Sequence, residues 1–540
     1  MAKAVPGNHP HEIAPREPDP PRWIPLLFIA LVLATFCPLL IGDFTSWDDY
    51  RAIVINAWLN PPTFEHLLEF WNPRHPYMDI WIPLTYTLWS ALAAVSYVPT
   101  ANPENGEHLN PWVFHGANLA VHVASALLVY AILCRATKRH WPAAAGAALF
   151  AVHPIQVEAV GWLAGMKDLL AGCMGLAAVW QYQQFAGESL DEPDRDRRRR
   201  AAHYSIATAA FVLAMLAKPS GVAVILVVGA FDLWILGRPI RKVFFALLPW
   251  LFLAIPIVLE GRFAQPAAQL PPVPLAMRPL IAADALAFYL WKLFFPLKLG
   301  IAYDHSPTRV IAGHWLYLTW LGPAAVAGCL FVVRRRTRWL IGAVGIFWLA
   351  VFPVLGFVPF DFQNYSTAAD HYLYLAMLGP AIAFAFAIRS LKPKVAVYTC
   401  IAILLPLATR SSMQTLVWRN SVSLFQNAIA VNPNSCALYN NLAEAYRSNY
   451  QPEQSLATFE AGLAKEPDCA ALRAGYAGLL ASIDRPDDAR RQFQIAAKSA
   501  TGALAQAIQQ SLQRLDKSPQ SATTKSNSAS NLTPQSAPIK

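Results

Sequence analysis

Repeated apolar runs of membrane-spanning length are the feature that most constrains this chain. The first, WIPLLFIALVLATFCPLLIG at 23–42, has 20 residues, the length that a helix needs to cross a bilayer. It is longer than the apolar part of a cleaved signal peptide and lacks a small-residue cleavage site, so we expect a retained anchor. The chain of 540 residues is 55% hydrophobic and only 14% charged. These features predict an all-α, polytopic membrane protein.

Clusters of Lys and Arg between the apolar runs predict the topology, because short basic loops stay on the cytoplasmic side. With these loops and the N-terminus inside, we expect eleven crossings and a C-terminal region outside. The expected spans are 23–42, 113–134, 142–157, 167–185, 203–217, 220–236, 244–260, 315–333, 339–358, 371–390 and 395–412.

The same topology requires that two other apolar stretches, 80–97 and 284–300, do not cross the membrane. Both contain an interior Pro or Lys together with Trp or Tyr, which favours interfacial helices on the outer surface. The first of them then belongs to a long outer loop, 43–112, which also contains the adjacent acids Asp48 and Asp49.

Several basic residues fall on the predicted outer side, against the usual charge bias. They are Arg51, Arg74, Lys167, Lys218, Arg262, Lys292 and Lys298. Each alone can be explained by a side chain that reaches the interface. As a set, they predict an anionic ligand such as a lipid phosphate at the outer leaflet.

Acidic and other polar residues are expected on the same side. Besides Asp48 and Asp49, they are His153, Gln156, Glu158, Asp168, Asp304, Asp370, His371 and Tyr372. Each alone is better explained as a structural partner of a nearby base or backbone group. Together they predict a polar outer cavity roofed by 43–112, an arrangement that favours chemistry.

The C-terminal region repeats with a period of 34 residues, as the positions of Phe425, Phe459 and Phe493 show. This is the period of the tetratricopeptide repeat (TPR), which has two antiparallel helices per unit and binds peptides or proteins. A stalk or dimer surface remains an alternative. The seven cysteines include no metal-binding spacing, and we expect Cys436 and Cys469 not to pair, since a bond would have to bridge two repeats.

The predicted organisation therefore has four regions. They are a cytoplasmic, disordered N-terminus (1–22), a transmembrane domain (23–412), a TPR domain (413–515) and a disordered tail (516–540).

Eight segments together resemble the transmembrane-and-TPR (TMTC-type) proteins and their bacterial relatives, members of the GT-C glycosyltransferase class. They are FTSWDD (44–49), WIPLTYTLW (81–89), FHGANLAVHVASALLVY (114–130), LFAVHPIQVEAVGWLAGMKDLLA (149–171), LAMLAKPSGVAVILVVGAFDLW (213–234), YLWKLFFPLKLGIAYDHSP (289–307), AADHYLYL (368–375) and WRNSVSLFQNAIAVNPNS (418–435). One departure is His371, where many relatives carry Arg.

The resemblance implies transfer of a sugar, mannose by family analogy, from a polyprenyl-phosphate donor to Ser or Thr hydroxyls of exported proteins. The acidic pair matches the position of the catalytic carboxylate, and we slightly favour Asp49 over Asp48 as the base. Lys167, Lys218 and Arg262 are the candidates for binding the donor phosphate. Two carboxylates beside a phosphate could hold a divalent metal, but no ligand cluster of diagnostic spacing occurs, so we predict none.

Two other functions stay open: a GT-C transferase that modifies a lipid or envelope glycan, and a non-enzymatic TPR scaffold. The expected partners are the lipid donor and a polypeptide acceptor or protein partner, with no nucleic acid. We expect a bacterial inner membrane with the TPR domain in the periplasm, or alternatively an endoplasmic reticulum membrane with a lumenal TPR domain.

Overall fold

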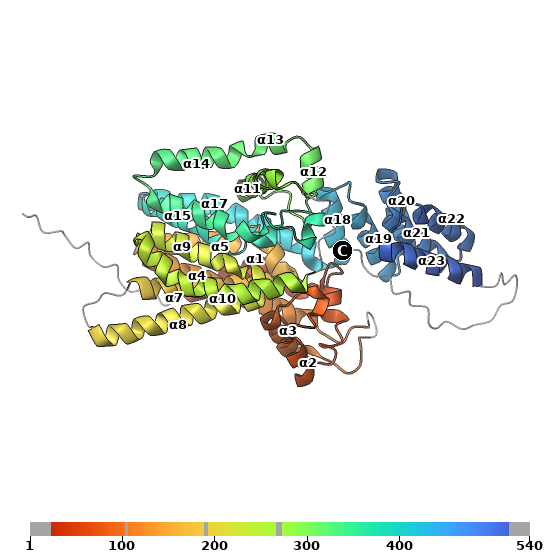
Figure 1. Ribbon diagram of the computed structural model, residues 1–540, viewed down its shortest axis with the longest axis horizontal. Helices are drawn as coiled ribbons and strands as arrows, with labels where there is room; N and C mark the ends of the chain where they lie inside the picture. The colour runs from red at the N-terminus through yellow and green to blue at the C-terminus, as the bar shows by residue number, and fades with distance from the viewer. Residues whose placement is uncertain (1–22, 103–105, 188–192, 266–272, 518–540) are drawn as a thin grey trace, which may run out of the picture.

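The computed structural model describes residues 23–102, 106–187, 193–265 and 273–517 (Figure 1). The predicted N-terminal segment, residues 1–22, lies outside the described residues, as does nearly all of the tail 516–540. The described residues form helices joined by loops, without a β-strand, so the expected all-α class is confirmed.

Helices α1 to α10 include the apolar anchor and the helices of the first outer loop. They are α1 Ile24–Phe36, α2 Phe64–Glu69, α3 Pro83–Ser96, α4 Pro111–Thr137, α5 His140–Val152, α6 Gln156–Gly161, α7 Met166–Gly187, α8 Pro193–Ala217, α9 Ala223–Ala230 and α10 Ile240–Ala264.

The remaining helices complete the bundle and form the C-terminal repeats. They are α11 Arg278–Phe294, α12 Pro307–Ala312, α13 Leu316–Thr319, α14 Leu321–Val333, α15 Arg338–Ala350, α16 Leu378–Arg389, α17 Pro393–Thr415, α18 Ser421–Val431, α19 Cys436–Ser448, α20 Pro452–Lys465, α21 Ala470–Ser482, α22 Pro486–Ala497 and α23 Gly502–Lys517.

Within the described residues, eight helical segments are long and apolar enough to cross a membrane, which indicates a multi-pass membrane protein. They are Ile24–Ile41, Pro111–Thr137, Leu163–Gly187, Arg197–Ala217, Pro219–Leu236, Ile240–Ala264, Leu316–Val333 and Pro393–Arg419. Each coincides with an expected span. The stretches 80–97 and 284–300 are not among them.

Three of the eleven expected spans fall on helices of only 12 or 13 residues, namely α5, α15 and α16. Proline explains two of these early ends, because Pro154 follows α5 closely and Pro353 follows α15. In the expected span 371–390, residues 371–377 form short turns, and the helix α16 begins only at Leu378. The assignment of the C-terminal region to the outer side requires an odd number of crossings. Because three expected spans fall on these short helices, the number of crossings is not established and the assignment stays a prediction.

Close helix packing in the bundle depends on small residues. Helix α16 packs against both α5 and α15. A Cβ atom on Gly146 of α5 would lie 2.5 Å from the Ala381 carbonyl, and one on Gly379 would meet the backbone of Ala343 and Phe347 in α15. Glycine at these two positions therefore lets the backbones approach, as is common between membrane helices.

The repeat helices α19–α23 lie at one end of the bundle, the same end as helices α2 and α3 of the loop 43–112 (Figure 1). Cys436 and Cys469, at or just before the starts of α19 and α21, form a disulfide with Cα atoms 6.5 Å apart. The expectation that they do not pair was therefore wrong. The physical reason is that equivalent helices of successive repeats stack side by side, which brings residues about one period apart together.

The repeats are not separated from the bundle by a linker. Helix α17 runs to Thr415, past the expected boundary at 412. Leu424 and Phe425 of α18 and Leu438 of α19 are buried in the same apolar core as the bundle helices. Asn427 also donates a hydrogen bond to the carbonyl of Leu299, at 2.8 Å. The first repeat helices thus belong to the bundle core.

Candidate active site

The loop 43–112 holds the carboxylate of Asp49 in a network of hydrogen bonds. One carboxylate oxygen accepts from the backbone N–H and the hydroxyl of Thr45, at 2.9 and 2.7 Å. The other accepts from the backbone N–H of Ala164, at 2.8 Å, which ties the loop to the segment before α7. Burial raises the pKa of Asp49 to about 6, and the hydrogen bonds oppose this rise. Three hydrogen bonds thus fix the position of the Asp49 carboxylate.

Asp48 is also buried, but its carboxylate points to a long, flexible side chain. One oxygen lies 3.9 Å from Nζ of Lys167, which is close enough for an ion pair. Burial raises the pKa of Tyr365, and the charges of Asp361 and Asp48 raise it further. The two adjacent acids therefore differ: backbone groups hold Asp49, and a lysine faces Asp48.

The lysine belongs to the first turn of α7, where the helix dipole favours negative charge. Lys167 Nζ also lies over the ring of Trp162, 4.5 Å from its centroid. Next to it in the chain, Asp168 pairs with Lys218 at 2.6 Å, and Lys218 lies 5.0 Å from the ring centroid of Tyr372. Two acid–lysine pairs therefore meet at the start of one long helix.

A third pair, Glu158 and His371, packs beside the Trp162 ring that contacts Lys167. His371 donates its backbone N–H to Glu158 at 3.2 Å, and its Nδ1 lies 2.9 Å from the other oxygen of the same carboxylate. The His371 ring packs against Trp162, with centroids 5.3 Å apart. Glu158 thus orients His371, and His371 packs beside the ring that contacts Lys167.

Asp370, next to His371 in the chain, belongs to a separate buried group with Tyr303 and Lys292. The hydroxyl of Tyr303 donates to it at 2.6 Å, and Lys292 lies 4.4 Å from the centroid of the Tyr303 ring. Burial raises the pKa of Asp370, Glu158 raises it further, and Lys292 opposes the rise. The two carboxylates line a cavity of about 10 Å³ beside Trp418, which has room for about one water molecule.

Four of the predicted site residues lie apart from the cluster. His153 contacts backbone groups, with Nε2 3.1 Å from the Leu293 carbonyl. Asp304 pairs with Arg309 at 3.5 Å in a different cavity. Arg74 is exposed in the loop after α2, and exposed Arg262 makes no ion pair with a described carboxylate.

The sequence analysis did not single out Trp162, Thr45 or Tyr303. Trp162 lies inside one of the quoted motifs, but nothing in its spacing sets it apart from the other tryptophans. Tyr303 directly precedes Asp304, and it is the tyrosine hydroxyl, not the neighbouring acid, that contacts Asp370. Among the described residues, no three His, Cys, Asp or Glu side chains gather into a group that could hold a metal ion.

Comparison with known proteins finds a family model, a solved structure and several curated relatives that match this chain. A family model described as "Tetratricopeptide repeat" matches residues 424–457, which confirms the repeats predicted from the 34-residue period. A solved structure of the Archaeoglobus fulgidus oligosaccharyltransferase, tethered with an acceptor peptide, is 16% identical and covers 80% of this chain and 59% of that one. Its TM-score is 0.39, too low to assign a shared fold.

Three curated relatives carry names from one family. Protein O-mannosyl-transferase Tmtc3 of Drosophila melanogaster is 23% identical over 67% of this chain and 47% of its own length. Human Protein O-mannosyl-transferase TMTC4 is 22% identical over 80% of this chain and 65% of its own length. Drosophila Tmtc2 is 34% identical, but over only 23% of this chain and 13% of its own length.

The chain spans about half the length of the first of these relatives and just under two thirds of the second. Apolar helices followed by tetratricopeptide repeats appear in the order that the quoted motifs predict. The resemblance stated from the sequence is confirmed: this chain is a distant homologue of the transmembrane and tetratricopeptide-repeat (TMTC) proteins.

Proposed function

We propose that this protein is a membrane glycosyltransferase that moves a sugar, mannose by analogy with its relatives, from a polyprenyl-phosphate donor to Ser or Thr hydroxyls. The observation that supports it most is the buried Asp48 carboxylate beside Lys167 at the start of α7, with a second acid–lysine pair next to it. A base beside clustered cations is what transfer from a lipid phosphate to a hydroxyl needs. The names of the relatives support the choice of sugar and acceptor.

Asp48 is the proposed base, in place of the slightly favoured Asp49. Both oxygens of Asp49 already accept hydrogen bonds from Thr45 and Ala164, so taking up a proton would break one of them. Asp48 faces the ammonium group of Lys167, whose long side chain can change its rotamer. In the proposed step the acceptor hydroxyl attacks the anomeric carbon, its proton passes to Asp48, and the bond from carbon to phosphate oxygen breaks. The configuration at that carbon inverts.

Lys167 and Lys218 are the proposed partners of the departing lipid phosphate. Each now faces an aspartate, so a bound phosphate would replace Asp48 as the partner of Lys167 and leave that carboxylate able to accept a proton. The N-terminus of α7 adds to the positive potential at the same point. Arg262 stays a weaker candidate, because it is exposed, although its neighbour Gly261 packs against Pro219, next to Lys218.

The repeats are proposed to bind the polypeptide acceptor or a partner protein on the outer side of a bacterial inner membrane. The disulfide between Cys436 and Cys469 supports that side, because such bonds persist in oxidising compartments. We expect a membrane-impermeant maleimide, added to intact spheroplasts, to label these two cysteines only after reduction. No labelling of these cysteines even after treatment with an impermeant reductant would argue for a cytoplasmic location, and labelling without reduction would argue against the disulfide.

Mass spectrometry of exported glycoproteins tests the function. We compare cells with the wild-type protein, the Asp48→Asn variant and a control, Asp43→Asn, which removes an exposed carboxylate from the same loop. Hexose on Ser or Thr of exported proteins should disappear only in Asp48→Asn. An unchanged protein profile in Asp48→Asn would overturn the proposal, and an altered envelope glycan in its place would favour a glycan acceptor.

A further inference from the structure

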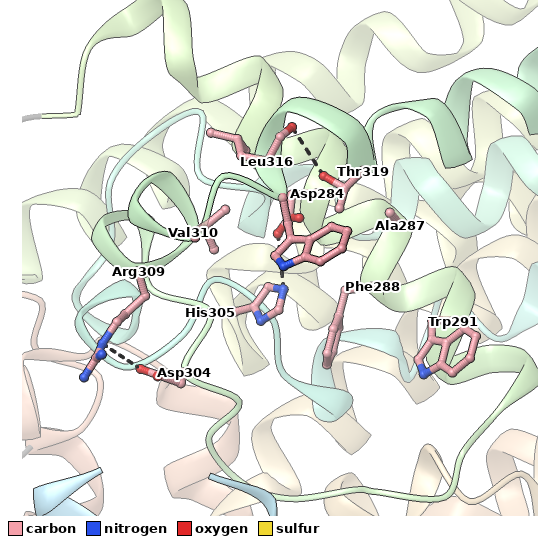
Figure 2. A pocket seen from close by; sticks show the side chains of 12 residues that line it. Asp284, Ala287, Phe288, Trp291, Asp304, His305, Arg309, Val310, Leu316 and Thr319 are labelled. Carbon is pink, nitrogen blue, oxygen red and sulfur yellow. Dashed lines mark hydrogen bonds and ion pairs between the residues drawn. The ribbon is translucent and has the colours of Figure 1, made fainter. Parts of the chain in front are cut away.

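A second cavity lies outside the proposed active site, between α11 and the chain that leads to α14. Its volume is about 480 Å³, which is in the range of small-ligand sites. Figure 2 shows its walls: α11 contributes Asp284, Phe288 and Trp291, and the facing segment includes His305 and Arg309. The proposed reaction uses none of these groups.

The cavity carries an excess of acid over permanent positive charge. Asp284 lies 3.2 Å from Nε2 of His305, and Asp304 lies 3.5 Å from Nε of Arg309 (Figure 2). Two lining carboxylates therefore face one imidazole, which is charged only when protonated, and one guanidinium. The guanidinium also lies 3.5 Å from a third carboxylate, that of Glu466, just after α20. A ligand that carries a cation beside an anion matches this pattern, whereas a ligand with only phosphate charge does not.

Aromatic and apolar side chains continue from the cavity onto the outside of the bundle. Trp315 lines the cavity just before the candidate span Leu316–Val333 and is 72% exposed, and Trp291 on α11 is 60% exposed. Phe294 and Leu318 are exposed beside them. Tryptophan at the end of a span is typical of the membrane interface. The cavity thus opens where headgroups meet acyl chains.

We propose that this cavity binds the headgroup of an ethanolamine phospholipid, independently of the proposed transferase reaction. The ammonium group pairs with the carboxylates of Asp284 and Asp304 and contacts the aromatic walls, since ring faces attract cations. The phosphate pairs with Arg309. The acyl chains cover the exposed apolar surface along α14, which a water-soluble ligand of the same charge would leave exposed.

Native mass spectrometry of the full-length protein in detergent tests this site with three probes. They are dilauroyl phosphatidylethanolamine, the phosphatidylglycerol with the same chains, and glycerophosphoethanolamine, which has the headgroup phosphodiester and ammonium without the chains. We expect the wild type to bind the ethanolamine lipid about tenfold more tightly than either other probe, since the lost ammonium or chain contacts set the difference.

Two variants and a control assign the binding to this cavity. Trp315→Leu should weaken binding of the ethanolamine lipid about fivefold. Trp112→Leu is the matched control, because Trp112 is 57% exposed and lies at the start of another candidate span, Pro111–Thr137, but does not line the cavity. The control should bind as the wild type does. Asp284→Asn together with Asp304→Asn should abolish the preference for ethanolamine over glycerol.

Asp304→Asn alone, at a carboxylate that is more than one third exposed, tests the same point if the double variant is not folded by size-exclusion chromatography. Equal binding of the two lipids by the wild type would overturn the proposal. So would equal loss in Trp315→Leu and Trp112→Leu, or binding of glycerophosphoethanolamine as tight as that of the lipid.

Discussion

Asp48 and Asp49 are adjacent in the chain, yet their carboxylates have different surroundings. The Asp49 carboxylate accepts three hydrogen bonds, of which one comes from Ala164, 115 residues further along the chain. The Asp48 carboxylate faces the ammonium group of Lys167. We therefore expect substitution of Asp49 to affect mainly the stability of the protein, and substitution of Asp48 to affect mainly its activity.

Asp49→Asn should lower stability more than Asp48→Asn does. An Asn amide has one acceptor oxygen, so its NH₂ group would face either Thr45 or the Ala164 N–H and leave that donor without a partner, at a cost of about 1–3 kcal/mol. Melting temperatures of the purified variants in the same detergent measure the effect, with Asp43→Asn as the reference. Equal melting temperatures for the two variants would contradict the bracing role of Asp49.

Lys218→Met should raise the KM for the polyprenyl-phosphate donor about tenfold to a hundredfold, because one charge-assisted contact to phosphate is lost. Lys218→Arg should restore most of the binding, since it keeps a cation beside Asp168. Lys298→Met removes an exposed lysine outside the cluster and should leave KM unchanged. The same rise in KM for Lys298→Met and Lys218→Met would count against a specific phosphate contact.

At the scale of helices, the tight contact of α16 with α15 depends on the missing side chain of Gly379. Gly379→Ala should destabilise the protein by about 1–3 kcal/mol, because the new methyl group would press on the backbone of Ala343 and Phe347. Gly328→Ala is the matched control in another candidate membrane helix, α14, where a Cβ would have nothing within 4 Å.

The readout is again the melting temperature, measured in one detergent. Gly328→Ala should leave it unchanged or raise it slightly, because alanine favours the helix. If Gly379→Ala were as stable as that control, then close backbone packing between α15 and α16 would not be needed.

The sequence predicts the elements whose pattern is local. Apolar runs of sufficient length locate the eight candidate spans, and the 34-residue step of Phe425, Phe459 and Phe493 locates the repeat helices. Each signal depends on residues close in the chain that share one environment. The short helices α5, α15 and α16 were overestimated, because apolar composition continues beyond the point where helical hydrogen bonds end.

Side-chain pairs between distant segments could be predicted only as a set. Asp48, Lys167, Asp168 and Lys218 were expected on one side, and they do form two pairs. Which acid pairs with which base depends on backbone geometry that composition does not specify. Asp304 is an example, because the acid pairs with Arg309 while its neighbour Tyr303 donates a hydrogen bond to Asp370.

For the whole molecule, the shared core predicts that the repeats differ in how much the bundle needs them. A chain that ends at Asn420 loses the buried side chains of Leu424, Phe425 and Leu438, each of which contributes about 1.5–3 kcal/mol. It should aggregate or unfold. A chain that ends at Asp484 keeps α18–α21 and should remain folded.

Fluorescence-detected size-exclusion chromatography of the two truncated proteins distinguishes these outcomes. We expect one symmetrical peak for the chain that ends at Asp484 and material in the void volume for the chain that ends at Asn420. A symmetrical peak for both would mean that α18 and α19 only rest on the bundle and do not contribute to its core.

The shared core also limits how such proteins can be recombined. In a chimaera that joins this bundle to the repeats of a relative, a junction at the apparent domain border near 412 would separate Phe425 from Trp47, whose rings lie 6.3 Å apart. A junction in the turn between α19 and α20 keeps that contact and the side chain of Leu438 in place. That junction separates Cys436 from Cys469, so the incoming repeats must carry a cysteine at the position of Cys469 to keep the disulfide. With that condition, the first exchangeable unit of the array begins at Pro452, and everything before it is inherited together with the membrane helices.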